Sequence, residues 1–162
     1  MSSSARRLAP GRLLVVGSPD YLKRNGTPKQ PSDLKRHNCL GYDYWALRDE
    51  WPLTGRDGRT ERVRVNGSLR ANNGDALRIA ALDGLGLILQ PSFSVGADIA
   101  AGRLVHVLPE YKPRELSVYA LYAPGSAPNA KLRTFIDTLA KTWGGTPPWE
   151  RFGERRRTKA KR

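Results

Sequence analysis

Residues 72–91 predict a helix and a strand separated by glycine; they read Asn-Asn-Gly-Asp-Ala-Leu-Arg-Ile-Ala-Ala-Leu-Asp-Gly-Leu-Gly-Leu-Ile-Leu-Gln-Pro. Asparagine suits a helix N-cap, and Asp75 suits the positive end of the helix dipole. Gly84 breaks the helix, and Leu87-Ile88-Leu89 follows as an apolar run that ends at Pro91. A short apolar run bounded by turn residues is typical of a buried strand. The stretch therefore predicts one helix–strand unit of an α/β fold.

Strands and helices also alternate on both sides of this unit. Further strands are predicted at 13–17, 39–42, 51–54, 59–65, 68–71, 104–108 and 116–122. Helices are predicted from Ser18-Pro19 to Asn25-Gly26, from Ser92 to Ala101-Gly102, and over 129–143, and a short helical turn starts at Ser32. Arg56-Asp57-Gly58 predicts a hairpin turn. We expect an α/β fold with a largely parallel sheet and one inserted hairpin.

The net charge of the chain is concentrated at its two ends. The 162 residues suffice for one domain or two small lobes, and they carry a charge of +13. Residues 1–12 hold three arginines and no acid, and residues 151–162 hold seven lysines or arginines and one glutamate. Residues 13–150 therefore keep only +4. Basic chain ends are most often solvated tails, so the charge alone is weak support for nucleic-acid binding.

The chain shows no pattern typical of an exported, membrane-spanning or catalytic protein. Cys39 is the only cysteine, which excludes an intramolecular disulfide. Residues 1–12 lack the apolar segment of a signal peptide, and no run approaches the ~18 apolar residues of a membrane helix. Gly84-Leu85-Gly86 lacks the third glycine of a dinucleotide fingerprint. We expect a cytoplasmic protein that is no enzyme and has no cofactor.

His37, His106 and Cys39 are expected to be structural. The two histidines lie far apart in the sequence, without metal-ligand spacing, so no metal site is expected. His37 is expected to make a structural hydrogen bond. Cys39 begins a predicted strand, where a buried thiol behaves as a small apolar residue rather than as a nucleophile.

Several fragments, in order along residues 6–143, resemble the effector-binding domain of LysR-type transcriptional regulators. The matching fragments are Ser18–Leu22, Gly26, Pro28, Pro31, Asp33-Leu34, His37–Leu40, Arg70–Leu77, Gly84–Pro91, Gly102–Pro109, Val118–Tyr122, Lys131–Arg133 and Phe135–Asp137. The resemblance implies a fold like that of type II periplasmic binding proteins, with a small effector held between two lobes. It also implies a preceding winged helix-turn-helix, which this chain lacks before Arg6. We therefore expect an N-terminally truncated bacterial regulator.

The resemblance also divides the chain into four parts. Residues 1–12 are expected to be a flexible basic N-terminus that enters the hinge. Residues 13–115 form the second lobe, and residues 116–143 form the return strand and C-terminal helix of a partial first lobe. Residues 144–162 are expected to be a disordered basic tail, because glycine, proline and basic residues dominate there.

The candidate effector site lies where predicted strands lead into helices. Ligands of open α/β sheets bind beyond the carboxyl ends of strands, and free N–H groups at helix starts favour a carboxylate. The candidate effector-binding residues at such starts are Ser18, Asn72, Asn73, Gly74 and Pro91. The resemblance adds Tyr42, Asp43 and Tyr44, which follow a strand end that faces the cleft in the family. Asp75 would oppose an anion if it faced the cleft. The alternative is that Ser18 and Asn72 are only helix caps and that the tyrosines only pack on the lobe surface.

Three functions remain open on the sequence alone. The first is the sensing of a small effector, with DNA contact through a domain absent from this chain and with homo-oligomers as in full-length relatives. The second is a periplasmic solute-binding protein, for which the N-terminus shows no export signal. The third is nonspecific nucleic-acid binding through Arg155–Arg157 and Lys159–Arg162, which salt would weaken steeply.

Overall fold

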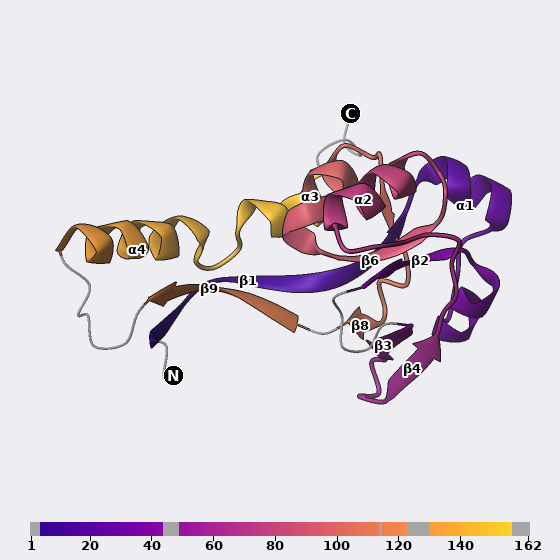
Figure 1. The fold of residues 1–162 in the computed structure, drawn as a ribbon, viewed down its shortest axis with the longest axis horizontal. Coiled ribbons are helices and arrows are strands. Elements are labelled where there is room, and N and C mark those ends of the chain that lie inside the picture. The colour runs from indigo at the N-terminus through magenta and orange to yellow at the C-terminus, as the bar shows by residue number, and fades with distance from the viewer. Residues whose placement is uncertain (1–3, 44–48, 114, 123–129, 157–162) are drawn as a thin grey trace.

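The computed structural model describes residues 4–43, 49–113, 115–122 and 130–156 (Figure 1). The strands are β1 (Ser4–Gly17), β2 (Cys39–Tyr42), β3 (Glu50–Thr54), β4 (Thr60–Arg64), β5 (Arg70–Ala71), β6 (Leu87–Pro91), β7 (Val105–His106), β8 (Lys112–Pro113) and β9 (Glu115–Tyr122). The helices are α1 (Pro19–Asn25), α2 (Gly74–Leu82), α3 (Ser92–Ala100) and α4 (Ala130–Trp143), with 3-10 helices η1 (Pro31–Arg36) and η2 (Pro148–Arg156).

The long strand β1 belongs to two parts of the fold. Its first half, residues 4–12, pairs antiparallel with β9, and this pair is here called the ribbon. Its second half, residues 13–17, lies between β6 and β7 in the sheet of the main lobe, which also carries α1, α2 and α3. Figure 1 shows the ribbon projecting from the main lobe, with α4 alongside it. The expectation of a flexible N-terminus is wrong for residues 4–12, because backbone pairing with β9 orders them.

The sheet of the main lobe is mixed rather than largely parallel. Its order is β5-β2-β6-β1-β7, with β2 parallel to both β5 and β6. β1 runs antiparallel to β6 and to β7, so the prediction of a largely parallel sheet is wrong. An apolar run such as Leu13–Val16 shows that a strand is buried, but it carries no information on the direction in which the strand runs.

Alternating side chains of β1 supply the core on both faces of the sheet. Leu13 and Val15 pack on one face, and Leu14 and Val16 pack on the other, as the two-residue period of a strand requires. The first face meets α1, η1 and the β3–β4 hairpin through Tyr21, Leu22, Leu34, Trp51, Leu53, Val63 and Val65. The second face meets α2 and α3 through Leu77, Ala81 and Val95. The four β1 side chains are at most 2% exposed.

The helix ends follow the predicted capping residues, with one shift. The Ser18 hydroxyl accepts a hydrogen bond from the Tyr21 N–H at 3.2 Å, and Gly26 ends α1 with φ of 81°. At α2 the N-cap is Asn73, whose Oδ1 accepts from the N–H of Asp75 at 2.8 Å. The prediction of Asn72 as the cap is therefore wrong by one residue, because only Asn73 has its side chain over the first turn.

The predicted hairpin forms a small sheet of its own beside the main lobe. β3 pairs antiparallel with β4, and β8 completes the order β4-β3-β8. The connecting turn contains Gly58 with φ of 78°, a conformation that favours glycine. Val63 and Val65 are buried while Arg62 and Arg64 are exposed, which confirms the predicted alternation.

The chain beyond Gly144 includes the 3-10 helix η2, which extends to Arg156 and packs on the main lobe. η2 contacts α3, and Trp149 and Phe152 supply the aromatic rings that meet Phe93 and His106. The expectation of disorder from Gly144 onward is therefore wrong for this part, because the two aromatic side chains find partly buried positions. Residues 157–162, the rest of the expected tail, lie outside the described residues.

The helix α4 keeps part of its apolar face in contact with solvent. Ile136 is 4% exposed, whereas Phe135 is 59% and Leu132 is 39% exposed. Tyr119 and Leu121 of β9 are also exposed. Within the described residues, no helix is both long and apolar enough to cross a membrane.

Candidate functional site

Three parallel strands of the main lobe end together at one edge of the sheet. Tyr42 at the end of β2 pairs with Ala71 at the end of β5, and Leu40 of β2 pairs with Ile88 of β6. The end of β6 at Pro91 therefore lies on the same edge. This edge is here called the carboxyl edge, and it is the position where open α/β sheets bind ligands.

Two helices begin at the carboxyl edge directly after these strands. α2 starts at Gly74, three residues after β5, and α3 starts at Ser92, immediately after β6. A Cβ atom at Gly74 would come within 2.9 Å of Oε1 of Gln90, a side chain that is 4% exposed. Glycine at position 74 thus permits the start of α2 to lie close to the end of β6. The predicted residues Tyr42, Asn73, Gly74 and Pro91 are brought together here.

Asp43 adds a paired carboxylate to this edge rather than a free one. Arg70 Nε donates to Asp43 Oδ1 at 2.9 Å, and Arg70 Nη1 donates to Asp49. Hydrogen bonds from Arg70 to Asp49 and to Asp43 raise the pKa of the arginine. Tyr42 is half-buried, and Asn72 is exposed. Tyr44, also predicted for the site, lies outside the described residues.

Ser18 lies at the opposite edge of the sheet. β1 runs antiparallel to β6, with Leu13 opposite Pro91 and Val16 opposite Ile88, so the end of β1 adjoins the beginning of β6. The Ser18 hydroxyl lies 3.4 Å from the position that a Cβ of Gly84 would take. Gly84 precedes the start of β6, whereas Pro91 stands at the other end of this strand. The grouping of Ser18 with the other site residues is wrong, because that grouping assumed β1 to be parallel. Ser18 acts as the cap of α1.

A cluster at the start of α3 was not found from the sequence. Arg12 Nε donates to Glu150 Oε2 at 2.7 Å, and the Ser92 hydroxyl donates to Glu150 Oε1. The N–H of Arg12 donates to the Ser92 hydroxyl at 3.2 Å. Ser92 is fully buried, and the Glu150 side chain is 13% exposed. No local signal joins positions 12, 92 and 150, because the contact depends on how η2 folds back.

The pair α2–α3 is joined by a buried carboxylate. Asp98 of α3 is fully buried and accepts hydrogen bonds from Arg78 Nη2 at 3.0 Å and from Arg103 Nε at 2.8 Å. Burial alone raises the pKa of Asp98, but the hydrogen bonds from Arg78 and Arg103 outweigh it, and the pKa lies below the usual value. This ion cluster fixes the two helices whose starts form the carboxyl edge.

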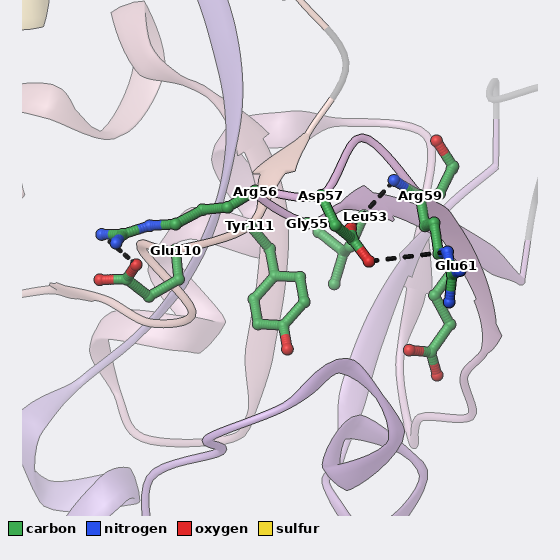
Figure 2. Close-up of a pocket in the computed structure, with 9 residues that line it drawn as sticks. Leu53, Gly55, Arg56, Asp57, Arg59, Glu61, Glu110 and Tyr111 are labelled. Atoms are coloured by element: carbon green, nitrogen blue, oxygen red, sulfur yellow. Dashed lines mark hydrogen bonds and ion pairs between the residues drawn. The ribbon is translucent and has the colours of Figure 1, made fainter.

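A hollow of about 630 Å³ lies beside the β3–β4 hairpin and away from the carboxyl edge. Figure 2 shows Tyr111 between the Arg56–Glu110 pair on one side and Asp57, Arg59 and Glu61 on the other. Arg56 binds Glu110, and Arg59 lies 3.8 Å from Asp57, so these charges are largely paired with each other. None of the predicted site residues lines this hollow.

His37 makes the structural hydrogen bond expected of it, Cys39 is buried as expected, and His106 is half-buried. The Nδ1 atom of His37 lies 3.0 Å from the Tyr21 hydroxyl, and burial lowers its pKa. Burial raises the pKa of the Cys39 thiol to about 12. Burial and the nearby Arg12 lower the pKa of His106 to about 4, and its Nε2 has no hydrogen-bond partner among the described residues.

Comparison with known proteins finds relatives that are HTH-type transcriptional regulators. The chain is 32% identical over 141 residues to the HTH-type transcriptional regulator CrgA of Neisseria meningitidis serogroup B, which covers 86% of this chain and 46% of CrgA. It is 34% identical over 139 residues to the HTH-type transcriptional regulator DmlR of Escherichia coli K12, which covers 83% of this chain and 44% of DmlR. The chain thus spans less than half the length of these curated relatives.

A solved structure shows the same fold. The regulatory domain of CrgA, a LysR-type transcriptional regulator from Neisseria meningitidis, superposes with a TM-score of 0.77 at 31% identity. The match covers 88% of this chain and 69% of that domain. The fold is therefore the type II periplasmic-binding-protein-like fold of LysR regulatory domains, as the family resemblance implied. Because the model of the LysR substrate binding domain also matches residues 2–144, the chain belongs to this family of LysR-type transcriptional regulators.

Proposed function

We propose that this chain senses a small carboxylate effector at the carboxyl edge of its main lobe. The observation that carries the proposal is the meeting of three parallel strand ends with the starts of α2 and α3. The start of α2 presents N–H groups and the positive end of the dipole, which favour an anion, whereas the start of α3 is already contacted by the Glu150 carboxylate through Ser92. Gly74 and the Gln90 amide beside it supply close backbone approach and neutral polar groups.

The charged groups at this edge limit the kind of anion that fits. Asp43 is paired with Arg70, so it contributes little net repulsion. Asp75 lies in the first turn of α2 and is exposed. An effector with one carboxylate and an apolar or aromatic body suits the site better than a polyanion, because Tyr42 and Pro91 offer apolar surface.

The lobes of the relatives provide the context of this proposal. The main lobe corresponds to the second lobe of the effector-binding domain, and the ribbon with α4 corresponds to part of the first lobe. In a full-length regulator, the effector would bias one lobe arrangement over another by binding it more tightly. In this proposal, DNA contact belongs to the DNA-binding domain of full-length relatives, and homo-oligomers form as in those relatives.

Thermal-shift measurements with a panel of small carboxylates test the proposal. A ligand at about 100 times its Kd adds about 2.7 kcal/mol to the stability, which is a shift of several degrees in Tm. The variant Asn73→Ala should reduce the ligand-induced shift. Ser18→Ala is the matched control, since it removes a similar cap at the opposite edge and should leave that shift unchanged.

Two results would contradict the proposal. One is the absence of a saturable shift with every carboxylate of the panel. The other is an equal loss of the shift in Ser18→Ala and Asn73→Ala, which would mean that lost helix stability rather than lost ligand contact explains the effect.

A further inference from the structure

Residues 147–152, here called the C-terminal strap, lie across the junction between the ribbon and the main lobe. Within β1, Arg12 is the last residue paired with β9, and Leu13 is the first paired with β6. The strap contacts β1 on the ribbon side of this junction. The indole N–H of Trp149 donates to the Pro10 carbonyl at 3.2 Å, and Glu150 accepts from Arg12 Nε at 2.7 Å.

The same strap is anchored on the main lobe. Glu150 also accepts a hydrogen bond from the buried Ser92 hydroxyl at the start of α3. Phe152 packs edge-on against His106 of β7, with ring centroids 6.4 Å apart, and the Arg12 guanidinium lies 5.2 Å from its ring centroid. One carboxylate and one ring therefore each contact both sides of the junction.

A glycine in α3 makes room for this arrangement. The backbone carbonyl of Trp149 lies so close to Gly96 that a Cβ atom there would overlap it. Glycine in the interior of a helix costs about 1 kcal/mol relative to alanine. Its presence at the point where the strap crosses α3 fits a close backbone contact that alanine would not permit.

We propose that the C-terminal strap is a releasable lock that sets the orientation of the ribbon relative to the main lobe. The ribbon joins the rest of the fold through two backbone connections, the continuous strand β1 and the strand β9, which begins two residues after β8 ends. The strap adds side-chain contacts through Glu150 and Trp149 to these two connections. Movement of the ribbon then requires the Arg12–Glu150–Ser92 contacts to open. This role does not depend on the identity of any effector.

Amide hydrogen exchange on the full chain tests the lock with two variants. Glu150→Gln removes the charge that joins Arg12 to Ser92. Gly96→Ala pushes the strap away from α3 without changing any strap residue. Both should speed exchange of the Arg12 amide, which donates to Ser92, by about tenfold, while amides in the centre of β6 keep their protection. Glu110→Gln, which breaks the exposed pair with Arg56, is the control and should change neither.

The sign of the Gly96→Ala effect separates the lock from a simple helix effect. Without a strap contact, alanine would stabilise α3 and slow exchange there. If both variants release the same strap, the double variant should exchange no faster than the faster single variant. Slower exchange in Gly96→Ala, additive effects in the double variant, or equal loss of protection throughout β6 would each overturn the proposal.

Discussion

The carboxylate of Asp98 in α3 accepts a hydrogen bond from Arg78 of α2 at 3.0 Å while being fully shielded from solvent. Arg103 supplies a second donor to the same carboxylate, and the side chains of the two arginines are 29% and 56% exposed. The burial of the acid is therefore compensated by two cations that keep contact with water. This cluster connects the helices whose N-termini define the candidate effector site.

Replacing Asp98 by alanine should destabilise the fold by about 3 kcal/mol. Breaking a buried ion pair leaves partly buried cations without a partner, and such losses amount to about 3–5 kcal/mol. The partial exposure of Arg78 and Arg103 places this case at the lower end of that range. Urea unfolding at pH 7 measures the loss. A cost below about 1 kcal/mol would show that the cluster contributes little.

The lowered pKa of Asp98 predicts that the folded protein loses stability in acid. The pKa of this carboxylate in the fold is lower than the unfolded value of 3.8, so the unfolded state binds the proton more readily. Its contribution is therefore present above pH 3.8 and is lost as the pH falls through the lower folded value. Asp98→Asn should flatten this acid limb. Urea unfolding of both proteins between pH 5 and 3 tests it, and parallel limbs would contradict the assignment.

The titration of His106 affects the stability of the fold in a different pH range. Its pKa of about 4 in the fold lies below the usual 6.5, because the imidazolium is disfavoured by burial and by Arg12. The unfolded state binds more protons between these values, so His106 lowers stability progressively as the pH falls from 6.5 to 4, by at most about 3 kcal/mol.

A His106→Leu variant should remove that slope. Because Nε2 makes no hydrogen bond with the described residues, leucine should cost less than about 1 kcal/mol at pH 7. Unfolding midpoints from pH 7 to 4 measure the difference between the two proteins. An unchanged slope in the variant would assign the titration to another group.

The sequence predicted the order of elements well but not the direction of β1. The apolar run of Leu13–Val16 and the Ser18-Pro19 cap are local signals, and both are confirmed. The antiparallel register of Leu13 with Pro91 is a tertiary property that the run does not encode. Because β1 is antiparallel to β6, Ser18 lies at the opposite edge of the sheet, whereas Tyr42, Gly74 and Pro91 lie together at the carboxyl edge.

The cluster at Arg12 could not be predicted for a similar reason. Glu150 lies in a segment rich in glycine, proline and charge, whose composition is typical of disorder. Trp149 and Phe152 anchor this segment on the main lobe. Two aromatic side chains so close together indicate an ordered contact, but the average composition of the segment does not show it. The position of the anchors on α3 depends on the folded helix.

Two glycines of the main lobe and hairpin should respond very differently to alanine. A Cβ at Gly67 would overlap the backbone carbonyl of Cys39, and backbone atoms of a buried strand cannot move aside cheaply. Gly58 faces open space but has φ of 78°, where alanine costs about 1 kcal/mol. Gly67→Ala should therefore cost at least about 2 kcal/mol more than Gly58→Ala in urea unfolding. Equal costs would show that the strand beside Gly67 shifts easily.

The Cys39 thiol should react with disulfide reagents only after the protein opens. It is 2% exposed, lies 3.5 Å from the Leu34 carbonyl, and has a pKa of about 12 caused by burial. The thiolate is the reactive form, so the folded chain offers almost none at pH 8. Labelling with an aromatic disulfide should be slow in buffer and rapid in denaturing urea. Destabilising the main lobe with Gly67→Ala should speed labelling, whereas rapid labelling of the unaltered protein in buffer would mean that β2 exposes its first residue to solvent.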